Sequence, residues 1–182
     1  MTVANRLTLT RILMVPIIFV AYYLPFSFAH LLAAVLFVLA ALTDLLDGAL
    51  ARKRNEITSF GKFADPIADK LLVAAMLLAL CGDGRIHAAI VFTIIAREFI
   101  VSGIRLVAVS SSPDNVIAAS WLGKLKTVIQ IVTIIVLLLD NWPFSYINLP
   151  MDQILIWLML VFTLWSGIDY LVKYWGTIGE TK

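Results

Sequence analysis

The stretch DLLDGALARKRNEITSFGKFADPIAD, residues 44–69, lies between two long apolar runs and carries four aspartates. Asp44 and Asp47 are three residues apart, and Asp65 and Asp69 are four residues apart. Both separations place side chains on one face of a helix, so each helix is expected to present two carboxylates in one direction. The stretch therefore predicts two neighbouring helices that meet at an acidic site.

The free-energy cost of this arrangement indicates its purpose. An aspartate within a membrane span costs roughly 2.5 to 3.5 kcal/mol on insertion scales, so four of them cost about 10 kcal/mol. Two carboxylates about 5 Å apart repel each other by roughly 3 kcal/mol at an effective dielectric constant near 20. A countercharge is needed, and an all-oxygen donor set suits Mg²⁺ or Mn²⁺. The four aspartates therefore predict a divalent-metal site.

The composition sets the fold class. Hydrophobic residues make up 62% of the 182 residues and charged residues 14%, whereas a soluble domain carries about 25% charged residues. The sequence predicts an all-α integral membrane protein, a single domain over residues 1–182 built as a bundle of six transmembrane helices. The apolar stretches that would form these spans are residues 9–25, 31–50, 62–81, 86–106, 119–139 and 151–173.

The basic residues orient this bundle. Six alternating spans place most of the lysines and arginines at ends or loops on one side, and only Arg85 in a loop on the other. The positive-inside rule then puts both termini and the acidic stretch on the cytoplasmic side of the cell (inner) membrane. The net charge of +2 is too small to indicate a nucleic-acid partner. The basic side is expected to face anionic lipid headgroups instead.

Small residues accompany the acids. Gly48 and Ala51 share the helical stripe of the first aspartate pair, and Gly61 shares the stripe of the second. Glycine and alanine beside carboxylates let a phosphate or a flat ligand approach the backbone. Alternatively, these small residues are helix contacts of the common membrane type. That alternative explains the glycines but not the acids.

The same stretch resembles a family signature. The pattern D-x2-D-G-x2-A-R-x8-G-x3-D-x3-D is the signature of the CDP-alcohol phosphatidyltransferases, and its fixed positions here are Asp44, Asp47, Gly48, Ala51, Arg52, Gly61, Asp65 and Asp69. The resemblance implies transfer of a phosphatidyl group from CDP-diacylglycerol to an alcohol, with release of CMP. It also implies a homodimer with six spans in each chain.

The resemblance carries roles for these residues. Asp44, Asp47 and Asp65 would hold Mg²⁺ or Mn²⁺ on the diphosphate, and Asp69 would contribute to a second metal position or act as the base, so that Asp65 and Asp69 form the catalytic pair. The nucleotide would lie against Asp47, Gly48, Ala51, Arg52 and Gly61. For Arg52 a competing explanation is an ordinary cytoplasmic basic flank shared with Lys53 and Arg54.

The acceptor is expected to bind in the second half of the chain. Arg97, Glu98 and Arg105 interrupt the fourth apolar stretch, and Lys124 and Lys126 open the fifth. Glu98 can pair with one of the cations, but one acid cannot neutralise four. The surplus positive charge favours a phosphorylated acceptor.

The local sequence narrows the acceptor further. The segments AREFIVSGIRLVA and WLGKLKT resemble the branch of the family whose acceptor is sn-glycerol 3-phosphate. The candidates for binding its phosphate are Arg97, Arg105, Lys124, Lys126 and Thr127.

The amino-terminal stretch adds candidate substrate contacts. Asn5, Thr8 and Arg11 are three residues apart and form a polar edge on a helix that enters the membrane. Members of this branch often read P-N-x-L-T-x-x-R here, and this chain departs from that pattern with Ala4 in place of proline. As an alternative, Arg6 and Arg11 only set the orientation of the first span.

Two other functions compete with this interpretation. Within the family, a cardiolipin synthase or an inositol-phosphate type synthase would use the same motif with a different acceptor. From another class, four membrane aspartates could form a divalent-cation transporter. Transport needs a continuous polar path, yet the outer halves of the predicted spans are almost free of ionisable groups.

Overall fold

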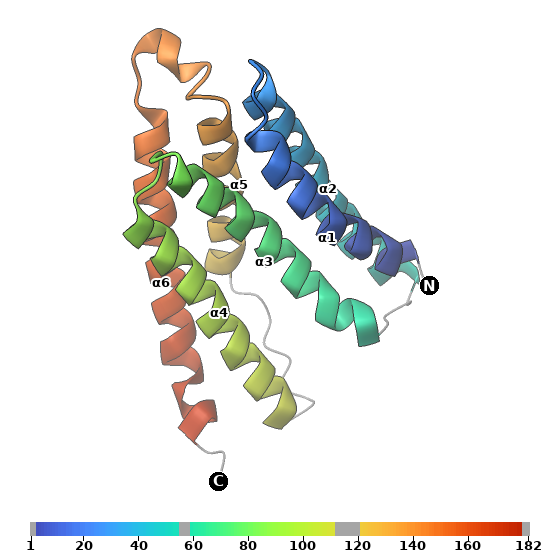
Figure 1. The fold of residues 1–182 in the computed structure, drawn as a ribbon. Helices are drawn as coiled ribbons and strands as arrows, with labels where there is room; N and C mark the ends of the chain where they lie inside the picture. The colour runs from blue at the N-terminus through green and yellow to red at the C-terminus, as the bar shows by residue number, and fades with distance from the viewer. Residues whose placement is uncertain (1–2, 55–58, 112–120, 180–182) are drawn as a thin grey trace. The chain divides into compact units, whose positions relative to one another are not determined.

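A computed structural model describes the backbone of residues 3–54, 59–111 and 121–179, and the side chains of residues 8–43, 67, 68, 70–104 and 121–173. The described residues form six α-helices and one short 3₁₀ helix, without a strand (Figure 1). This result confirms the predicted all-α class. The elements are α1 (Val3–Tyr22), α2 (Ala29–Arg54), α3 (Ser59–Gly82), α4 (Ala88–Ser111), α5 (Trp121–Leu138), η1 (Phe144–Ile147) and α6 (Met151–Gly179).

Each helix overlaps one of the six predicted apolar stretches, and the largest difference in bounds is at α1. The prediction of residues 9–25 begins too late, because the helical hydrogen bonds continue through the polar residues from Val3. It also ends too late, because α1 ends at Tyr22. The Tyr23 and Leu24 amides that follow donate to the carbonyls three residues before them, whereas an α-helix continues with bonds to the carbonyl four residues before. Leu24 precedes Pro25, and a residue before proline disfavours the helical conformation.

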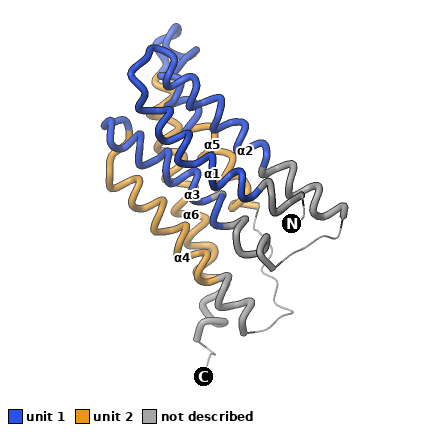
Figure 2. The backbone as a smooth tube through the Cα atoms, turned by 45° about the vertical axis from the view of Figure 1, so that its right-hand side comes forward, with its two compact units in different colours: residues 1–85, 134–149 blue, residues 86–133, 150–182 orange. Residues whose placement is uncertain are grey.

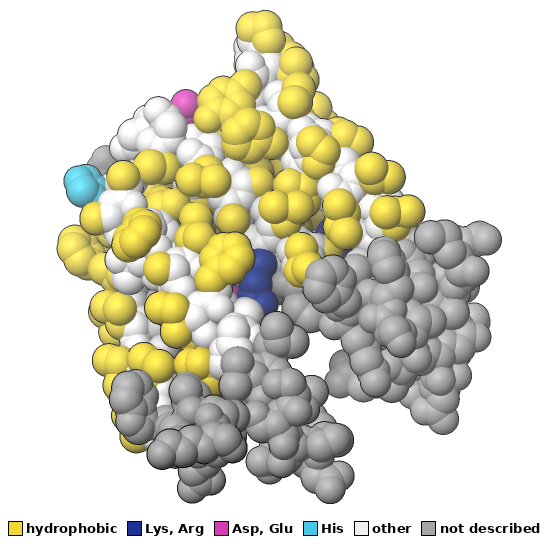
Figure 3. Space-filling model, turned by 60° about the horizontal axis from the view of Figure 1, so that its bottom comes forward, with side chains coloured by type: hydrophobic (Ala, Val, Ile, Leu, Met, Phe, Trp, Pro, Cys, Tyr) yellow, Lys and Arg dark blue, Asp and Glu magenta, His cyan; other side chains and the backbone are white. Residues whose placement is uncertain are grey.

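Apolar surface is a general feature of the described helices. Two of them are long and apolar enough to cross a membrane, Trp121–Leu138 and Met151–Lys173, and the shorter apolar segments are Thr8–Tyr22, Ala29–Thr43 and Lys70–Gly82. Large side chains such as Leu13, Phe92 and Trp157 are more than half exposed. Apolar side chains cover much of the described surface in Figure 3. Exposed apolar area on this scale suits a lipid environment.

The chain forms two compact units, residues 1–85 with 134–149 and residues 86–133 with 150–182 (Figure 2). In the first unit α1 packs against both α2 and α3. The side chains buried there include Ile18 of α1, Phe37 of α2 and Met76 of α3. The helix α1 therefore contacts both helices that carry the acidic motif.

A polar cluster ties the first unit together at the end opposite the motif. Arg85 donates to Asp140 and also lies 3.3 Å from Nδ1 of His30. The His30 ring stacks on Tyr22 at 4.8 Å, and the Tyr22 hydroxyl donates to Asp83 at 2.6 Å. These contacts join the end of α1, the start of α2 and the segments that follow α3 and α5.

The second unit buries polar side chains among apolar ones. Its helices α4 and α6 pack against each other. Apolar side chains such as Ile94 and Met159 are buried there together with polar ones, which are Lys126, Gln130 and Thr133 of α5 and Thr163 and Ser166 of α6. Buried polar groups inside apolar helices either bond to the backbone and neighbouring helices or mark a functional site.

Candidate functional site

The acidic motif lies on two helices that contact each other. Asp44 and Asp47 belong to the second half of α2, and Asp65 and Asp69 to the first half of α3. The helices α2 and α3 contact each other as well as α1. The side chains of the motif lie outside the described residues; these are Asp44, Asp47, Gly48, Ala51, Arg52, Gly61, Asp65 and Asp69. Their convergence stays a prediction.

Helical register relates the α2 aspartates to the described core. Ala33, Phe37 and Ala40 are fully buried and are separated by four and three residues. Asp44 and Asp47 follow Ala40 at four and seven residues in the same helix. The spacing therefore continues the stripe that α2 buries within the first unit.

The α3 aspartates have the same relation to their helix. Ala68, Leu72 and Met76 are buried. Asp65 precedes Ala68 by three residues, and Asp69 precedes Leu72 by three. By sequence spacing, both aspartates share the helical period of these three residues. The meeting of the two carboxylate pairs stays a prediction.

The helix α1 contributes a buried cation to this unit. Thr8 and Arg11 are 1% and 2% exposed, and they share a helical stripe with the buried residues Val15 and Ile18. An arginine that only set membrane orientation would lie at the interface with its charge in water. A buried guanidinium needs an anion nearby, and α1 packs on both aspartate-bearing helices. Burial therefore favours an internal role for Arg11, whereas Asn5 lies outside the described side chains.

In the second unit, three charged groups of the predicted acceptor site meet. Glu98 Oε1 accepts hydrogen bonds from Lys126 Nζ and, at 3.2 Å, from Arg97 Nη1. The Lys126 side chain is 4% exposed, that of Arg97 11% and that of Glu98 19%. Two cations from α4 and α5 thus share one carboxylate oxygen. Guanidinium and ammonium groups are also the donors that bind phosphate oxygens.

The other acceptor candidates have different surroundings. Lys124 is exposed on α5, and the Thr127 hydroxyl donates to the Gly123 carbonyl at 3.0 Å. The side chain of Arg105 lies outside the described residues. Of the five candidates, the structure brings Arg97 and Lys126 together around Glu98.

The sequence interpretation missed the contribution of α6. Arg97 Nη2 donates to Ser166 Oγ at 2.9 Å, and the Arg97 Cζ atom lies 6.0 Å from the centroid of the Tyr170 ring. Gly167, which lies between Ser166 and Tyr170 in the sequence, is next to the Arg97 side chain. The signal in the sequence is the small pair Ser166–Gly167 inside an apolar helix, a pattern typical of close helix contacts.

The predicted metal site falls on the motif. Among residues whose side chains the structure describes, no group of three or more His, Cys, Asp or Glu could hold a metal ion. The candidate ligands Asp44, Asp47, Asp65 and Asp69 lie outside that set. Their chemistry is a set of hard carboxylate oxygens, which fits a divalent cation such as Mg²⁺ or Mn²⁺.

Known proteins resemble the chain along nearly all of its length. Residues 1–165 match the family model of the CDP-alcohol phosphatidyltransferases. The chain is 42% identical to the CDP-diacylglycerol–glycerol-3-phosphate 3-phosphatidyltransferase of Bacillus subtilis (strain 168), with 96% of this chain and 95% of the relative covered. The proteins of the same name from Rickettsia felis and Yersinia enterocolitica are 40% and 36% identical. These matches cover 91% and 99% of this chain, and 91% and 98% of the relatives.

Proposed function

The chain belongs to the CDP-alcohol phosphatidyltransferase family, and we propose that it transfers the phosphatidyl group of CDP-diacylglycerol to sn-glycerol 3-phosphate. The products are phosphatidylglycerophosphate and CMP. The observation that carries the choice of acceptor is that two largely buried cations, Arg97 and Lys126, meet at one oxygen of Glu98. Full-length relatives named for this reaction support the same choice.

The enzyme acts in the membrane. The proposed arrangement is one domain over residues 1–182, with six spans and with both termini and the active site on the cytoplasmic side of the inner membrane. The two span-length helices and the three shorter apolar segments support it, as does the concentration of basic residues on one side. A homodimer is part of the proposal, by analogy with the family.

The aspartates of the motif would hold the divalent metal in this proposal, with Asp44, Asp47 and Asp65 as its ligands. When bound, Mg²⁺ or Mn²⁺ neutralises the diphosphate and the charge that develops on departing CMP. Gly48, Ala51 and Gly61 border the nucleotide because they leave room beside the backbone, and Arg52 lies at its charged end.

The carboxylates also handle the proton. Asp69 accepts the proton of the acceptor hydroxyl while the acceptor oxygen attacks the lipid-side phosphorus. A new phosphorus–oxygen bond forms, the bond to the CMP phosphate oxygen breaks, and CMP leaves with the electron pair. Asp65, one helical turn away, completes the catalytic pair.

The acceptor is bound through its phosphate. Arg97 and Lys126 are the central contacts, and Arg105, Lys124 and Thr127 are further candidates from α4 and α5. Guanidinium and ammonium groups both donate charge-assisted hydrogen bonds to phosphate oxygens. In the first unit, Thr8 and Arg11 are buried on the helix that packs on both motif helices. They are proposed to contact substrate there together with Asn5.

A panel of acceptors tests this function. Purified protein with Mg²⁺ and CDP-diacylglycerol is expected to release CMP with sn-glycerol 3-phosphate, but not with phosphatidylglycerol or inositol phosphate. CMP release with phosphatidylglycerol would assign a cardiolipin synthase, and release with inositol phosphate an inositol-phosphate type synthase. Metal flux into proteoliposomes without any nucleotide, in the absence of CMP release, would favour a transporter.

A pair of lysine variants tests the acceptor site. Lys126→Met keeps most of the buried volume but removes the charge, and we expect the KM for sn-glycerol 3-phosphate to rise roughly 10-fold to 100-fold, since a hydrogen bond to a charged group contributes about 1.5 to 3 kcal/mol. The KM for CDP-diacylglycerol should stay the same. Lys173→Met is the control, because Lys173 is exposed on α6 and pairs with Asp169 outside the proposed acceptor site.

The control variant should change either KM less than about twofold, as expected for an exposed charge. Thermal melting of both variants in detergent separates loss of binding from loss of folding. An equal rise in both substrates' KM for Lys126→Met would indicate a structural lysine.

A further inference from the structure

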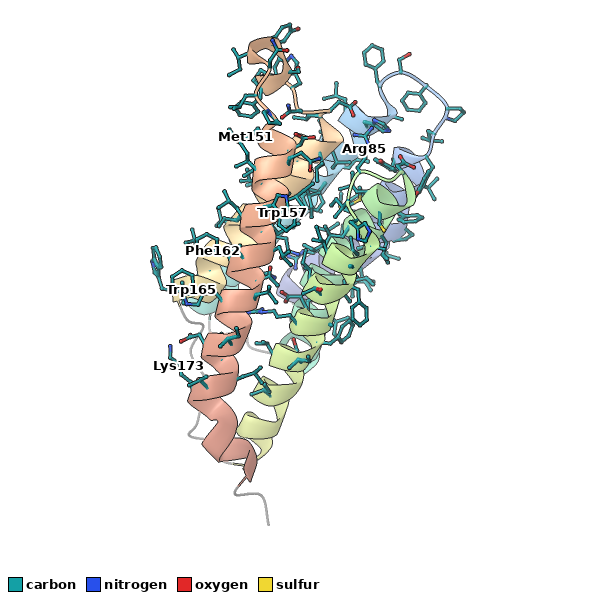
Figure 4. The ribbon with its side chains drawn as sticks, turned by 90° about the vertical axis from the view of Figure 1, so that its left-hand side faces the viewer. Arg85, Met151, Trp157, Phe162, Trp165 and Lys173 are labelled. Carbon is teal, nitrogen blue, oxygen red and sulfur yellow. The ribbon has the colours of Figure 1, made fainter. Side chains whose placement is uncertain are left out.

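The helix α6 contacts Arg97 of the proposed acceptor site at a different nitrogen from the one that contacts Glu98. Figure 4 shows α4 and α6 side by side, with the labelled Trp165 pointing away from α4. The next residue, Ser166, accepts a hydrogen bond from Arg97 Nη2 at 2.9 Å. One turn further along, Tyr170 places its ring centroid 6.0 Å from Arg97 Cζ, within the range of a cation–π contact. These contacts link α6 directly to the cluster of Arg97, Glu98 and Lys126.

The Ser166 hydroxyl is oriented by its own helix. It donates to the Phe162 carbonyl at 2.7 Å, and a hydroxyl has only one proton to donate. Its lone pairs are therefore left to accept from Arg97. Because Ser166 is 1% exposed, water does not compete for this contact. The Ser166 oxygen is thus oriented to accept the hydrogen bond from Arg97 before any ligand binds.

Gly167 leaves the space that the Arg97 side chain needs. A Cβ atom at position 167 would lie 3.0 Å from Arg97 Cγ and 3.6 Å from Arg97 Nε. The first distance is shorter than ordinary carbon–carbon contact at about 3.5 to 4.0 Å. Since Cγ is close to the backbone of Arg97, a side chain at position 167 would shift the whole guanidinium.

The two ends of the guanidinium have different partners. Nη1 donates to Glu98 and Nη2 donates to Ser166. These two contacts use two of the five N–H donors of an arginine. A planar group held at both nitrogens has little freedom to rotate, whereas a lysine ammonium is a single point and could not make both contacts in this way.

We propose that Ser166, Gly167 and Tyr170 form a positioning cradle on α6 that fixes the Arg97 guanidinium for the phosphate of the acceptor. The inference rests on the proposed function, because it takes that phosphate as the ligand of Arg97. Ser166 is a positioning residue that acts through Arg97. Fixing the arginine in advance lowers the entropy lost when the acceptor binds.

The first test is Ser166→Ala. The variant loses the hydroxyl oxygen that accepts the hydrogen bond from Arg97. We expect the KM for sn-glycerol 3-phosphate to rise about tenfold, with kcat and the KM for CDP-diacylglycerol within about twofold of the wild type. Thr93→Val is the control, since Thr93 on α4 also donates to the carbonyl four residues before it, that of Ala89, away from Glu98. The control should leave both KM values unchanged. A Ser166→Ala enzyme with an unchanged acceptor KM would overturn the cradle.

A second variant pair tests the cradle without removing a hydrogen bond. Gly167→Ala is expected to raise the acceptor KM several-fold, because the new methyl group displaces Arg97. Gly103→Ala, on α4, is the control, since a Cβ there would meet nothing within 4 Å. Both changes replace a helical glycine by alanine, so their effects on the backbone are alike. Equal acceptor KM values for the two variants would contradict the role of Gly167.

A double-mutant cycle tests whether Ser166 acts through Arg97. In an Arg97→Lys background, Ser166→Ala should raise the acceptor KM by no further factor, because lysine has no second nitrogen to position. A further tenfold rise would show that Ser166 acts independently of Arg97 and would sink the proposal. If the wild type releases no CMP with sn-glycerol 3-phosphate, the proposed function fails and the cradle with it. If the wild type is active and Ser166→Ala matches it, the cradle alone fails.

Discussion

Asp69→Asn is expected to lower the turnover number by about a thousandfold while the enzyme still binds CDP-diacylglycerol. A positioned general base contributes about 10² to 10⁴ in rate, and an amide of the same shape cannot accept the proton of the acceptor hydroxyl. Binding should persist because Asp44, Asp47 and Asp65 are the proposed ligands of the metal that meets the diphosphate. The expected result is thus a loss of kcat with little change in affinity for the CDP-lipid.

Two measurements check this expectation. CMP release at saturating sn-glycerol 3-phosphate reports turnover, and equilibrium binding of CDP-diacylglycerol reports affinity. Asp169→Asn is a matched control on α6, where the Asp169 carboxylate pairs with Lys173 at 2.8 Å in an exposed i, i+4 arrangement. Such a pair contributes little to stability, so the control should keep wild-type turnover. Loss of CDP-lipid binding in Asp69→Asn would show that Asp69 is a metal ligand instead of the base.

The sequence predicts the helices well because apolar length is a local property. Each described α-helix overlaps one apolar stretch, as α5 at Trp121–Leu138 does with residues 119–139. The bounds differ where hydrogen bonding continues past the apolar part, as at Val3 in α1. Apolar length reports burial in lipid, whereas a helix ends where its backbone bonds end.

The acceptor site shows the limit of spacing arguments. Lys124 and Lys126 are two residues apart, so they cannot face the same way on α5, but spacing does not tell which one is buried. The structure buries Lys126 against Glu98. Contact across helices is harder still, because Arg97 and Ser166 are 69 residues apart in the chain. Periodicity relates residues within one helix and carries no information on which helices meet.

The amino-terminal arginine shows what packing adds. From the sequence, Arg11 suits membrane orientation as well as substrate contact. The structure buries it because Arg11 shares a helical stripe with Val15 and Ile18, the stripe that α1 packs into the first unit. An arginine there incurs a large desolvation penalty unless an anion lies close by. Burial of this charge supports the proposed substrate contact, which stays a prediction.

Metal withdrawal is expected to abolish CMP release and, unlike Asp69→Asn, to abolish CDP-diacylglycerol binding as well. Without a cation, each neighbouring pair of motif carboxylates repels by roughly 3 kcal/mol, and the diphosphate adds further negative charge. Binding then becomes unfavourable before any proton moves. Adding Mg²⁺ or Mn²⁺ should restore both CMP release and CDP-diacylglycerol binding. Ca²⁺ should restore them less, because it prefers more oxygen ligands at longer distances.

The measurements are CMP release and CDP-lipid binding after treatment with a chelator, followed by titration with each cation. Asp44→Asn is the companion variant, and we expect it to need a higher Mg²⁺ concentration for half-maximal binding, because one carboxylate ligand is lost. Asp169→Asn should keep the wild-type Mg²⁺ requirement, since its carboxylate pairs with Lys173 outside the motif. Full CMP release in the presence of the chelator would contradict the metal site. The four aspartates would then need a different countercharge, and the buried Arg11 of α1 would be the first group to test.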